Sequence, residues 1–593
     1  MVNNKVRLII FVLILIFLLA VLPPLSKVFS DFLDVYKFNL SLLPDDFLSL
    51  AFKNPQTYIG FFSIINPPNI LCWSLIALFI IYFLFGMLGS KNQKRYVQKD
   101  DYGSHGTSRF QSQKEIKRNY FKYSSGWFLG SDRPSLSYRI GMSGAYHSLN
   151  GDLNMQIAVF GCPGSYKTTA SVLPNIFHIP FVYKNSPEKA DMIITDPKCE
   201  LYSLTAEYLR KENYEVRVLD FLNLKYGDSL NPLSFISDDK ELMEIAEGFI
   251  NSSSEGKNTY STDPFWEKSE SQLLGALIGF VKQVYPEYQQ TFSEVLKLLT
   301  SQNVRVPEKA ETFFTDFCVK GSALQLWNNY LLAEDKVRAN ILIGLATKLK
   351  LFSIPGVVNL TETSSINIKR IGIKKERPMA LFILMPDNDR TFSPIINSIV
   401  TSVLSQLYKT AASLGGSLIS PTYLILEEMA NIGNIPSIEM MLGTMRSRRI
   451  YPMLIWQSLP QMKNRYPNSW EDILSMCDTH LYLGINDDLT ANYCSSSLGN
   501  TTIKIQSTHS KNDSLFLDSS PSQSQNYYMR KLMLADECKR LPQSHLILSQ
   551  RSLYPAMLYK VQYKYWNEKD RICEKTNLEG LKKISADTLA IQH

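Results

Sequence analysis

The residues best suited to chemistry lie between Met155 and Thr169, where a short apolar run ends in a Gly/Pro/Ser loop and a Lys-Thr pair opens a helical stretch. A strand, a loop and a helix N-terminus in this order are typical of a P-loop, whose backbone N–H groups hold phosphate oxygens. Lys167 would reach the β- and γ-phosphates of ATP, and the Thr168 hydroxyl would bind Mg²⁺. The residues expected to contact the nucleotide are Gly161, Gly164, Ser165, Tyr166, Lys167, Thr168 and Thr169.

The loop departs from the pattern G-x-x-x-x-G-K-[ST] at one position, because Tyr166 stands where the pattern has glycine. A side chain at this position costs about 1–2 kcal/mol if its backbone must adopt a positive φ. The motif alone therefore leaves two interpretations open, a nucleotide site and an ordinary strand–turn–helix.

Two further groups of polar residues follow apolar runs. Glu427 and Glu428 come directly after Thr422–Leu426, in the layout of a Walker B strand. There the first acid orients water on Mg²⁺ and the second activates the attacking water, although two adjacent acids after a strand also occur by chance. Gln457 follows the apolar run Met453–Trp456, which places an amide at the strand edge where open α/β sheets bind ligands.

Short apolar runs alternate with helical patterns on both sides of a long helical stretch. This alternation predicts an α/β fold with a parallel sheet covered on both faces. The expected strands are the run before Gly161 and residues 191–195, 215–219, 379–385, 422–426, 453–456, 480–483 and 545–548. Between residues 236 and 352 strand signals vanish and apolar residues recur at helical spacing, which predicts an inserted all-α domain. Its Trp266, Trp327 and Tyr330 are interpreted as core aromatics, with stacking platforms for single-stranded DNA as the alternative.

Composition adds little about function. The formal charge of +7 is mild and does not by itself indicate nucleic acid. The eight cysteines include no C-x-x-C pair and no spacing to histidine that suits zinc. Residues 500–528 are rich in Ser, Thr, Asn and Gln, which we interpret as a mobile loop or a partly disordered insert.

Two apolar runs near the N-terminus predict a membrane hairpin. Ile70–Leu88 has no charged residue and is long enough to cross a bilayer, and Leu8–Leu22 is a shorter apolar run before Pro23. A signal peptide is the alternative for the first run, but no small-x-small cleavage site follows it. Lysines and arginines flank the outer ends of both runs, which predicts a multi-pass protein of the cell membrane with both termini cytoplasmic.

These patterns divide the chain into five parts. Residues 1–95 form the transmembrane hairpin with its extracytoplasmic loop, and 96–235 form the first part of the nucleotide-binding domain. The inserted all-α domain spans 236–352, the second part of the nucleotide-binding domain spans 353–567, and 568–593 is a charged tail.

Several phrases together resemble the type IV secretion coupling proteins, the TraG/TraD group of conjugation ATPases. The first are Tyr102-Gly-Ser-His-Gly-Thr-Ser-Arg-Phe, the P-loop followed by Leu173-Pro-Asn, Ile194-Thr-Asp-Pro-Lys-Cys-Glu-Leu and Asn231-Pro-Leu. The others are Leu426-Glu-Glu-Met-Ala-Asn-Ile-Gly, the helix with Arg446, Arg448 and Arg449, Trp456-Gln-Ser and Leu498-Gly-Asn-Thr. The resemblance extends over about residues 1–560 and is specific as a set.

The resemblance implies a RecA-like P-loop domain that assembles as a homo-hexamer around a pore and uses ATP and Mg²⁺. It implies that Glu428 is the water-activating base, that Glu427 supports the metal and that Gln457 senses the γ-phosphate. Arg446 would be the finger that reaches a neighbour's nucleotide. Three departures from the family's phrases are Tyr166 for glycine, Glu427 for aspartate and Cys199 for the glycine of D-P-K-G-E.

The leading hypothesis is a membrane-anchored ATPase that couples a relaxase and its single-stranded DNA to a type IV secretion channel. Its partners would be the relaxase and relaxosome proteins, single-stranded DNA, channel subunits and the membrane. The alternative is a nucleotide-binding receptor or scaffold that hydrolyses little ATP, which the altered P-loop motivates. A double-strand DNA pump lacks support, because the charged tail is too short for a DNA-reading winged helix.

Overall fold

The computed structural model describes scattered positions between residues 14 and 77, and then residues 105–121, 126–134, 144–149, 151–253, 264–509 and 522–562. The chain divides into two compact units, Met1–Gln98 and Lys99–His593. The predicted charged tail 568–593 lies outside the described residues.

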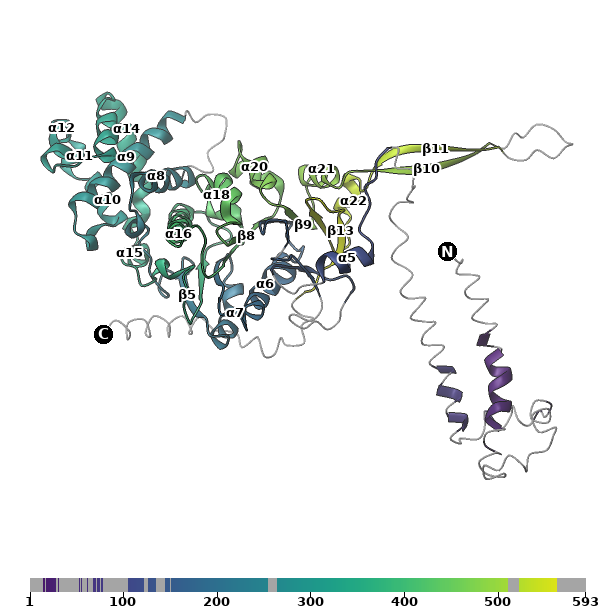
Figure 1. Ribbon diagram of the computed structural model, residues 1–593. Coiled ribbons are helices and arrows are strands. Elements are labelled where there is room, and N and C mark those ends of the chain that lie inside the picture. The colour runs from purple at the N-terminus through teal and green to yellow at the C-terminus, as the bar shows by residue number, and fades with distance from the viewer. Residues whose placement is uncertain are drawn as a thin grey trace. The chain divides into compact units, whose positions relative to one another are not determined.

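A nine-stranded sheet forms the centre of the second unit, in the order β13-β12-β9-β3-β8-β7-β4-β6-β5 (Figure 1). The strands from β9 to β5 run parallel, whereas β12 pairs antiparallel with both β9 and β13. The strands are β3 (Ile157–Gly161), β4 (Asp191–Asp196), β5 (Glu215–Asp220), β6 (Met379–Leu384), β7 (Thr422–Leu426), β8 (Ile450–Trp456), β9 (Thr479–Gly484), β12 (His545–Gln550) and β13 (Ala556–Tyr559). The predicted α/β fold class is confirmed for this part of the chain.

The sheet is buried on both faces, which explains why its strands are continuous apolar runs. Ile157 and Val159 of β3 belong to a core cluster that also contains residues of the helices α6 and α7, whereas Ala158 and Phe160 are buried outside it. Figure 1 shows α6 and α7 on one side of the sheet and α16 and α18 on the other. These helices are α6 (Leu173–Val182), α7 (Glu200–Lys211), α16 (Ser393–Ser413) and α18 (Ile438–Met445). The last ends before Arg446, Arg448 and Arg449, which the sequence analysis places in this helix.

Strand order decides which loops meet. β8 lies between β3, which carries the P-loop, and β7, which ends at the paired acids. Ile157 pairs with Met453 of β8, and Ile425 of β7 pairs with the same residue from the other side. Because parallel strands end at the same edge, the P-loop, Gln457 and the two glutamates converge at the carboxyl edge of the sheet.

The named elements among the described residues between β5 and β6 are all helices, and Figure 1 shows them gathered beyond the β5 side of the sheet. Trp327 and Tyr330 are buried in its core, as predicted, whereas Trp266 is 37% exposed. Its helices are α8 (Asp239–Ser253), α9 (Pro264–Val284), α10 (Phe292–Leu299), α11 (Gln302–Arg305), α12 (Pro307–Asp316), α13 (Ser322–Leu331), α14 (Asp335–Leu349) and α15 (Pro355–Thr361).

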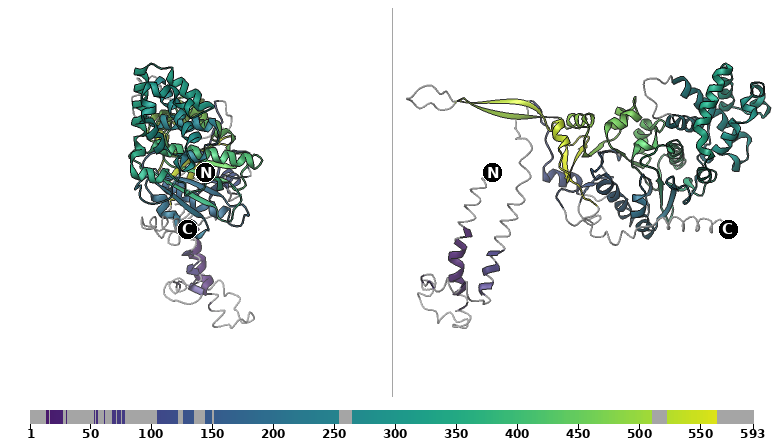
Figure 2. Two further views of the ribbon diagram at one scale, coloured as in Figure 1. Left: turned by 90° about the vertical axis from the view of Figure 1, so that its left-hand side faces the viewer. Right: turned by 180° about the vertical axis from the view of Figure 1, so that it is seen from behind.

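The interpretation of residues 500–528 as a mobile or disordered insert is wrong for the residues that the structure describes there. β10 (Asn500–His509) and β11 (Ser522–Lys531) form an antiparallel ladder in continuous register from Asn500↔Lys531 to His509↔Ser522. β-Branched Thr and Ile side chains suit this conformation even where the overall composition is polar. Figure 2 shows the hairpin extending away from the sheet in the view from behind.

The described residues of the second unit also form smaller elements. Residues 128–130 and 145–146 form the short antiparallel pair β1 (Phe128–Gly130) and β2 (Ala145–Tyr146), which the sequence did not indicate. The remaining helices are α5 (Gln113–Tyr120), α17 (Met429–Ile432), α19 (Leu459–Arg465), α20 (Trp470–Ser475), α21 (Asp488–Ser497) and α22 (Ala535–Lys539).

The first unit contains the two predicted membrane segments, and most of their residues lie outside the described ones. Phe17–Lys27 is a short apolar helix, and Leu15, Leu19 and Leu22 pack against a cluster that includes Cys72 and Ile76. Among the described residues, no single helix is long and apolar enough to cross a bilayer. Only a pair bent by 84°, Asp335–Ser353 with Pro355–Thr361, passes by length and composition. The two predicted spans therefore remain a prediction.

Candidate functional site

A cavity of about 370 Å³ opens at the carboxyl edge of the sheet and joins the loops after β3, β4, β7 and β8. All the predicted nucleotide and metal residues line it except Gly161, and Glu428 and Gln457 line it as well. The lining residues are Cys162, Pro163, Gly164, Ser165, Tyr166, Lys167, Thr168, Thr169, Asp196, Pro197, Lys198, Glu200, Asp387, Glu427, Glu428 and Gln457.

The P-loop follows β3 and closes against its own first residue. The Ser165 N–H donates to the Cys162 carbonyl over 3.1 Å. A Cβ on Gly161 would lie 2.4 Å from the Ser165 hydroxyl and 2.6 Å from Lys167 Cγ, so this position has no room for a side chain. Gly164 meets no neighbour within 4 Å but has φ +77°, so it is needed for its backbone conformation.

Tyr166 adopts the strained conformation that the sequence pattern implies. Its φ is 66°, in the left-handed region that a P-loop normally gives to glycine. Its carbonyl accepts from the Ala170 N–H over 2.8 Å, and its partly buried ring packs against the core beneath the sheet. The loop therefore keeps its glycine-like backbone, and Tyr166 both packs against the core and lines the cavity.

Lys167 and Thr168 begin the helical turn after the loop. The π-helical turn η2 (Thr168–Val172) leads directly into α6, whose Pro174 lacks an N–H to donate to the carbonyl four residues earlier. The Lys167 ammonium donates to the Gly161 carbonyl over 2.5 Å, and desolvation by burial lowers its pKa. The Thr168 hydroxyl donates to Glu427 Oε1 over 2.5 Å, so the two predicted metal residues meet.

Glu427 is almost fully buried at the end of β7, and burial raises the pKa of its carboxyl to about 8. The Thr168 hydrogen bond and Lys167 oppose this rise, whereas Asp196 and Glu428 add to it. Asp196, at the end of β4, is also buried, and its pKa is raised to about 6 although it accepts from the N–H groups of Lys198, Glu200 and Tyr202. The cavity thus holds several carboxyl groups that repel one another.

Glu428 follows Glu427 in the chain, but its side chain points in a different direction. Its backbone is left-handed, with φ 56° and ψ 54°, at the N-cap of α17. This conformation turns its carboxylate toward β8, where Oε1 accepts from the Gln457 amide over 2.8 Å. The predicted base and the predicted γ-phosphate sensor are therefore in direct contact across the carboxyl edge.

Arg446 is not part of this cavity. It follows α18 and precedes β8, so it lies at the amino edge of the sheet, at the opposite end of the strand from Gln457. Its exposed guanidinium donates to the carbonyls of Asp152 and Gly151 over 2.7 and 2.9 Å. Within one chain Arg446 cannot reach the P-loop, which agrees with the hypothesis of a finger acting on a neighbour but does not test it.

Similarity to known proteins decides the family of this chain. The family model described as "Type IV secretory system Conjugative DNA transfer" matches residues 107–586. The chain belongs to this family. The predicted resemblance is therefore confirmed, on the part of the chain that carries the sheet, the cavity and the helical segment.

Members of this conjugative DNA transfer family are distant relatives of the chain. The conjugal transfer protein TraG of Rhizobium radiobacter is 22% identical over 435 residues, which cover 70% of this chain and 61% of the relative. TraG of Escherichia coli is 24% identical over 371 residues, 59% of this chain and 57% of the relative. The chain thus matches between 57% and 61% of the length of these two relatives.

Two solved structures of a conjugative coupling protein, TrwB, share the fold of this family member. The unbound form lacking its N-terminal segment has a TM-score of 0.56 at 15% identity and covers 79% of this chain and 93% of its own. TrwB in complex with ADP and Mg²⁺ has a TM-score of 0.52 at 13% identity, and the match covers 79% of this chain and 95% of the TrwB chain. At this identity the likeness shows the fold, and it confirms the RecA-like α/β core.

The sequence predicted no role for three polar residues that lie in or next to the cavity. Asp196 and Lys198 belong to a phrase that carried the resemblance, and the Lys198 ammonium lies 3.5 Å from Asp387 across the cavity mouth. Lys560 lies beneath the P-loop and donates to the Ser165 carbonyl over 3.1 Å. The first two could have been found as polar residues after a predicted strand, whereas no local pattern marks Lys560.

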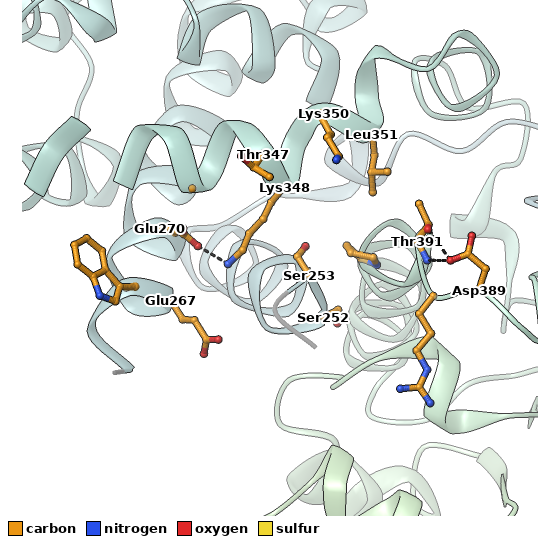
Figure 3. A pocket seen from close by; sticks show the side chains of 14 residues that line it. Ser252, Ser253, Glu267, Glu270, Thr347, Lys348, Lys350, Leu351, Asp389 and Thr391 are labelled. Carbon is orange, nitrogen blue, oxygen red and sulfur yellow. Dashed lines mark hydrogen bonds and ion pairs between the residues drawn. The ribbon is translucent and has the colours of Figure 1, made fainter. Parts of the chain in front are cut away.

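A larger cavity, of about 570 Å³, lies between the helical segment and the loop before α16. Figure 3 shows Glu270 and Lys348 facing each other inside it, with Asp389 and Thr391 on the opposite wall. Gly344 packs against Glu270, since a Cβ there would lie 2.0 Å from Glu270 Oε1. None of the residues predicted for nucleotide binding lines this cavity, and its charged groups have both signs.

Proposed function

We propose that this chain is a membrane-anchored ATPase that couples a relaxase–single-stranded DNA substrate to a type IV secretion channel. The observation that carries the proposal is the single cavity in which the P-loop, Glu427, Glu428 and Gln457 meet. Membership of the conjugative DNA transfer family supports the biological setting. ATP and Mg²⁺ as cofactors are supported by the solved TrwB complexes with ADP and Mg²⁺ and with a non-hydrolysable ATP analogue.

The residues present fit a magnesium nucleotide. The buried hydroxyls of Ser165 and Thr169, two residues that line the cavity, have no hydrogen-bond partner among the described residues. The Thr168 hydroxyl and the Glu427 carboxyl already meet at one point, as oxygen ligands of Mg²⁺ must. When bound, Mg²⁺ would neutralise part of the charge on the phosphate oxygens.

The remaining chemistry belongs to the chain's own side chains. Lys167 binds the β- and γ-phosphates and gives up its contact with the Gly161 carbonyl to do so. Glu428 accepts a proton from the attacking water, because it is the carboxylate on the accessible side of the pair. Gln457 orients this carboxylate through its amide and reports on the γ-phosphate. Orientation by fixed groups is the main source of catalysis in phosphoryl transfer.

The active site is shared between subunits of a homo-hexamer, and Arg446 supplies the finger in trans. Two facts support this part of the proposal: Arg446 is at the far edge of its own sheet, and its side chain is exposed where a neighbour can approach. The contacts with the carbonyls of Gly151 and Asp152 give the guanidinium a fixed resting position.

The DNA and protein partners follow from the family. The body binds single-stranded DNA mainly through phosphates, so its affinity falls steeply with salt and varies little with base sequence. The helical segment 236–352 recognises the relaxase and relaxosome proteins, because it interrupts the nucleotide fold without supplying any of its predicted motifs. Exchanging it for the same segment of a relative should redirect relaxase binding, and unchanged specificity would favour a cap that only stabilises the ring.

The membrane hairpin places both termini in the cytoplasm. Labelling of a single cysteine introduced near residue 45 with an impermeant reagent tests this topology in intact cells. Labelling from outside is expected, and a protected cysteine would contradict it.

A nucleotide-binding receptor with little hydrolysis is the second candidate, and Tyr166 in its strained conformation favours it. Steady-state ATP hydrolysis by the full chain, with and without single-stranded DNA, separates the two. The ATPase hydrolyses ATP measurably and is stimulated by DNA. Nucleotide binding without turnover, even with DNA and partners present, would establish the receptor instead.

A further inference from the structure

Lys560 is a buried lysine directly beneath the P-loop. It follows β13, and the residue is only 8% exposed. Its ammonium donates to the Ser165 carbonyl over 3.1 Å and to the Leu483 carbonyl at the end of β9. It therefore ties the last strand of the sheet to the phosphate loop, 395 residues earlier in the chain.

The hydrogen bond from Lys560 to the Ser165 carbonyl lies next to the strained residue of the loop, Tyr166. The Ser165 carbonyl belongs to the peptide group that joins Ser165 to Tyr166, and the orientation of this peptide is set by the left-handed backbone of Tyr166. The same ammonium lies 6.0 Å from the centre of the Tyr166 ring, at the outer limit of a cation–π contact. One side chain thus touches both the peptide and the ring of the residue that replaces glycine.

Burying this ammonium is costly. Within the part of the chain that the structure describes, no carboxylate forms an ion pair with Lys560, and desolvation lowers its pKa to about 8. A buried ammonium held by carbonyls alone is expensive unless its hydrogen bonds are well made. A methionine or leucine would fill the same space at lower cost if packing were the only requirement.

We propose that Lys560 is a positioning residue for nucleotide binding, which holds the Ser165–Tyr166 peptide and the Tyr166 ring so that the loop keeps its phosphate-binding shape without glycine. The proposal rests on the proposed function, because it assumes that the loop binds a nucleotide. The competing view is that Lys560 only fastens β13 to β9 through the Leu483 carbonyl. The two differ in what happens when glycine is restored at position 166, because glycine adopts the left-handed conformation unaided.

The test is a double-mutant cycle on the full-length chain, with the affinity for a fluorescent ATP analogue as the main readout and the melting temperature as the second. Lys560→Met is expected to weaken binding about 10-fold, and Lys560→Arg is expected to stay within about 3-fold of the unaltered chain. In the Tyr166→Gly background, Lys560→Met should weaken binding less than about 3-fold. Tyr166→Ala serves as the matched control, because it removes the ring but keeps the strained Cβ.

Equal losses of affinity in both backgrounds would overturn the proposal, and so would an unchanged affinity in Lys560→Met. A fall in melting temperature of the same size in both backgrounds, with affinity unaffected, would establish the fastening role instead. If Lys560→Met does not fold, Lys560→Gln retains a donor for one carbonyl and enters the same cycle. Absence of nucleotide binding by the unaltered chain would count against the proposed function, which keeps the two failures distinct.

Discussion

The two edges of the parallel sheet hold their charged groups in different ways. At the amino edge two buried carboxylates are paired with cations of the same chain: Asp191 accepts from Lys375 over 2.7 Å and from the Met379 N–H over 2.6 Å, and Asp478 pairs with Arg551 over 2.6 Å. At the carboxyl edge Lys167 contacts a carbonyl, Glu427 a hydroxyl and Glu428 an amide.

This difference in the partners of the charged groups indicates which edge of the sheet binds a ligand. A buried charge that is paired with an opposite charge has little electrostatic attraction left for a substrate, whereas one that has only neutral partners retains most of it. The two amino-edge carboxylates therefore stabilise the fold. At the carboxyl edge the Lys167 ammonium and the carboxyl groups of Glu427 and Glu428 have neutral hydrogen-bond partners and stay available to a phosphate and its metal.

Removing Lys167 should have the largest effect, because it is the cation of the carboxyl edge that lies within the loop itself. Lys167→Ala is expected to weaken ATP binding by about 100-fold or more, and turnover should become undetectable, since a charge-assisted contact to phosphate is lost. Titration with a fluorescent ATP analogue and a phosphate-release assay measure the two effects. Lys184→Ala, in the turn after α6, is the control, and an equal loss there would show a general effect of charge.

Arg446 tests whether an amino-edge residue can serve a carboxyl-edge site of another subunit. Arg446→Ala should lower turnover by about 10³-fold, as removal of a finger does. Its nucleotide affinity and melting temperature should change little, because the residue is exposed. Mixing Arg446→Ala chains with Glu428→Gln chains should restore part of the activity at mixed interfaces, as measured by phosphate release. Mixtures no more active than either variant alone would show that Arg446 only braces the Gly151–Asp152 loop.

Glu428→Gln separates binding from chemistry at the carboxyl edge. The amide cannot accept the proton of water, so turnover should fall by about 10²-fold or more while ATP affinity stays within about 3-fold. Single-turnover hydrolysis and equilibrium binding measure the two quantities. A parallel loss of affinity would mean that the contact with Gln457 shapes the site rather than the reaction.

The sequence predicted the elements whose signals are local. The strands of the sheet are continuous apolar runs, and the P-loop and the paired acids directly follow such runs, so their meeting at one edge could be inferred. The strain at Tyr166 could also be inferred, because the pattern requires glycine there, and Cys199 shows the same left-handed backbone with φ 57°.

The rest depends on contacts between distant parts of the chain. The hairpin β10–β11 was missed because its polar composition hides a run of β-branched residues, and pairing between strands supplies the stability that composition does not reveal. Lys560 was missed because its role comes from a contact across 395 residues. The resting contacts of Arg446 also lie far away in sequence, on Gly151 and Asp152.

Acid should destabilise the side of the molecule near the amino edge through its buried histidines. Burial lowers the pKa of His147 to about 4 from an ordinary value near 6.5, although Asp478 opposes this and Arg446 adds to it. Between these values the unfolded chain binds more protons than the folded one, so stability rises with pH and is lost as pH falls from about 6.5 to 4. His480 contributes in the same direction, because burial lowers its pKa too.

His147→Gln should therefore flatten the pH dependence of the unfolding free energy in this range by up to about 3 kcal/mol. Urea unfolding at a series of pH values measures it. His105→Gln, which changes an exposed histidine, is the matched control and should leave the profile unchanged. An unaltered slope in His147→Gln would mean that other groups cause the acid sensitivity.

The smallest effect is expected at Cys199, the second position where the family's phrase has glycine. Its backbone is left-handed at the N-cap of α7, between Lys198 and Glu200, which line the cavity. Cys199→Gly relieves about 1 kcal/mol of backbone strain but also gives the unfolded chain more freedom, which offsets about 0.4–1 kcal/mol. Stability should therefore stay within about 1 kcal/mol of the unaltered chain.

Cys199→Ala keeps the strain and loses the packing of the thiol, so it should be the less stable of the two in urea unfolding. ATP affinity should be the same in both, since Cys199 makes no contact with the P-loop among the described hydrogen bonds. An alanine variant as stable as the glycine variant would show that the left-handed turn costs nothing here, and a change in affinity would place Cys199 in the nucleotide site.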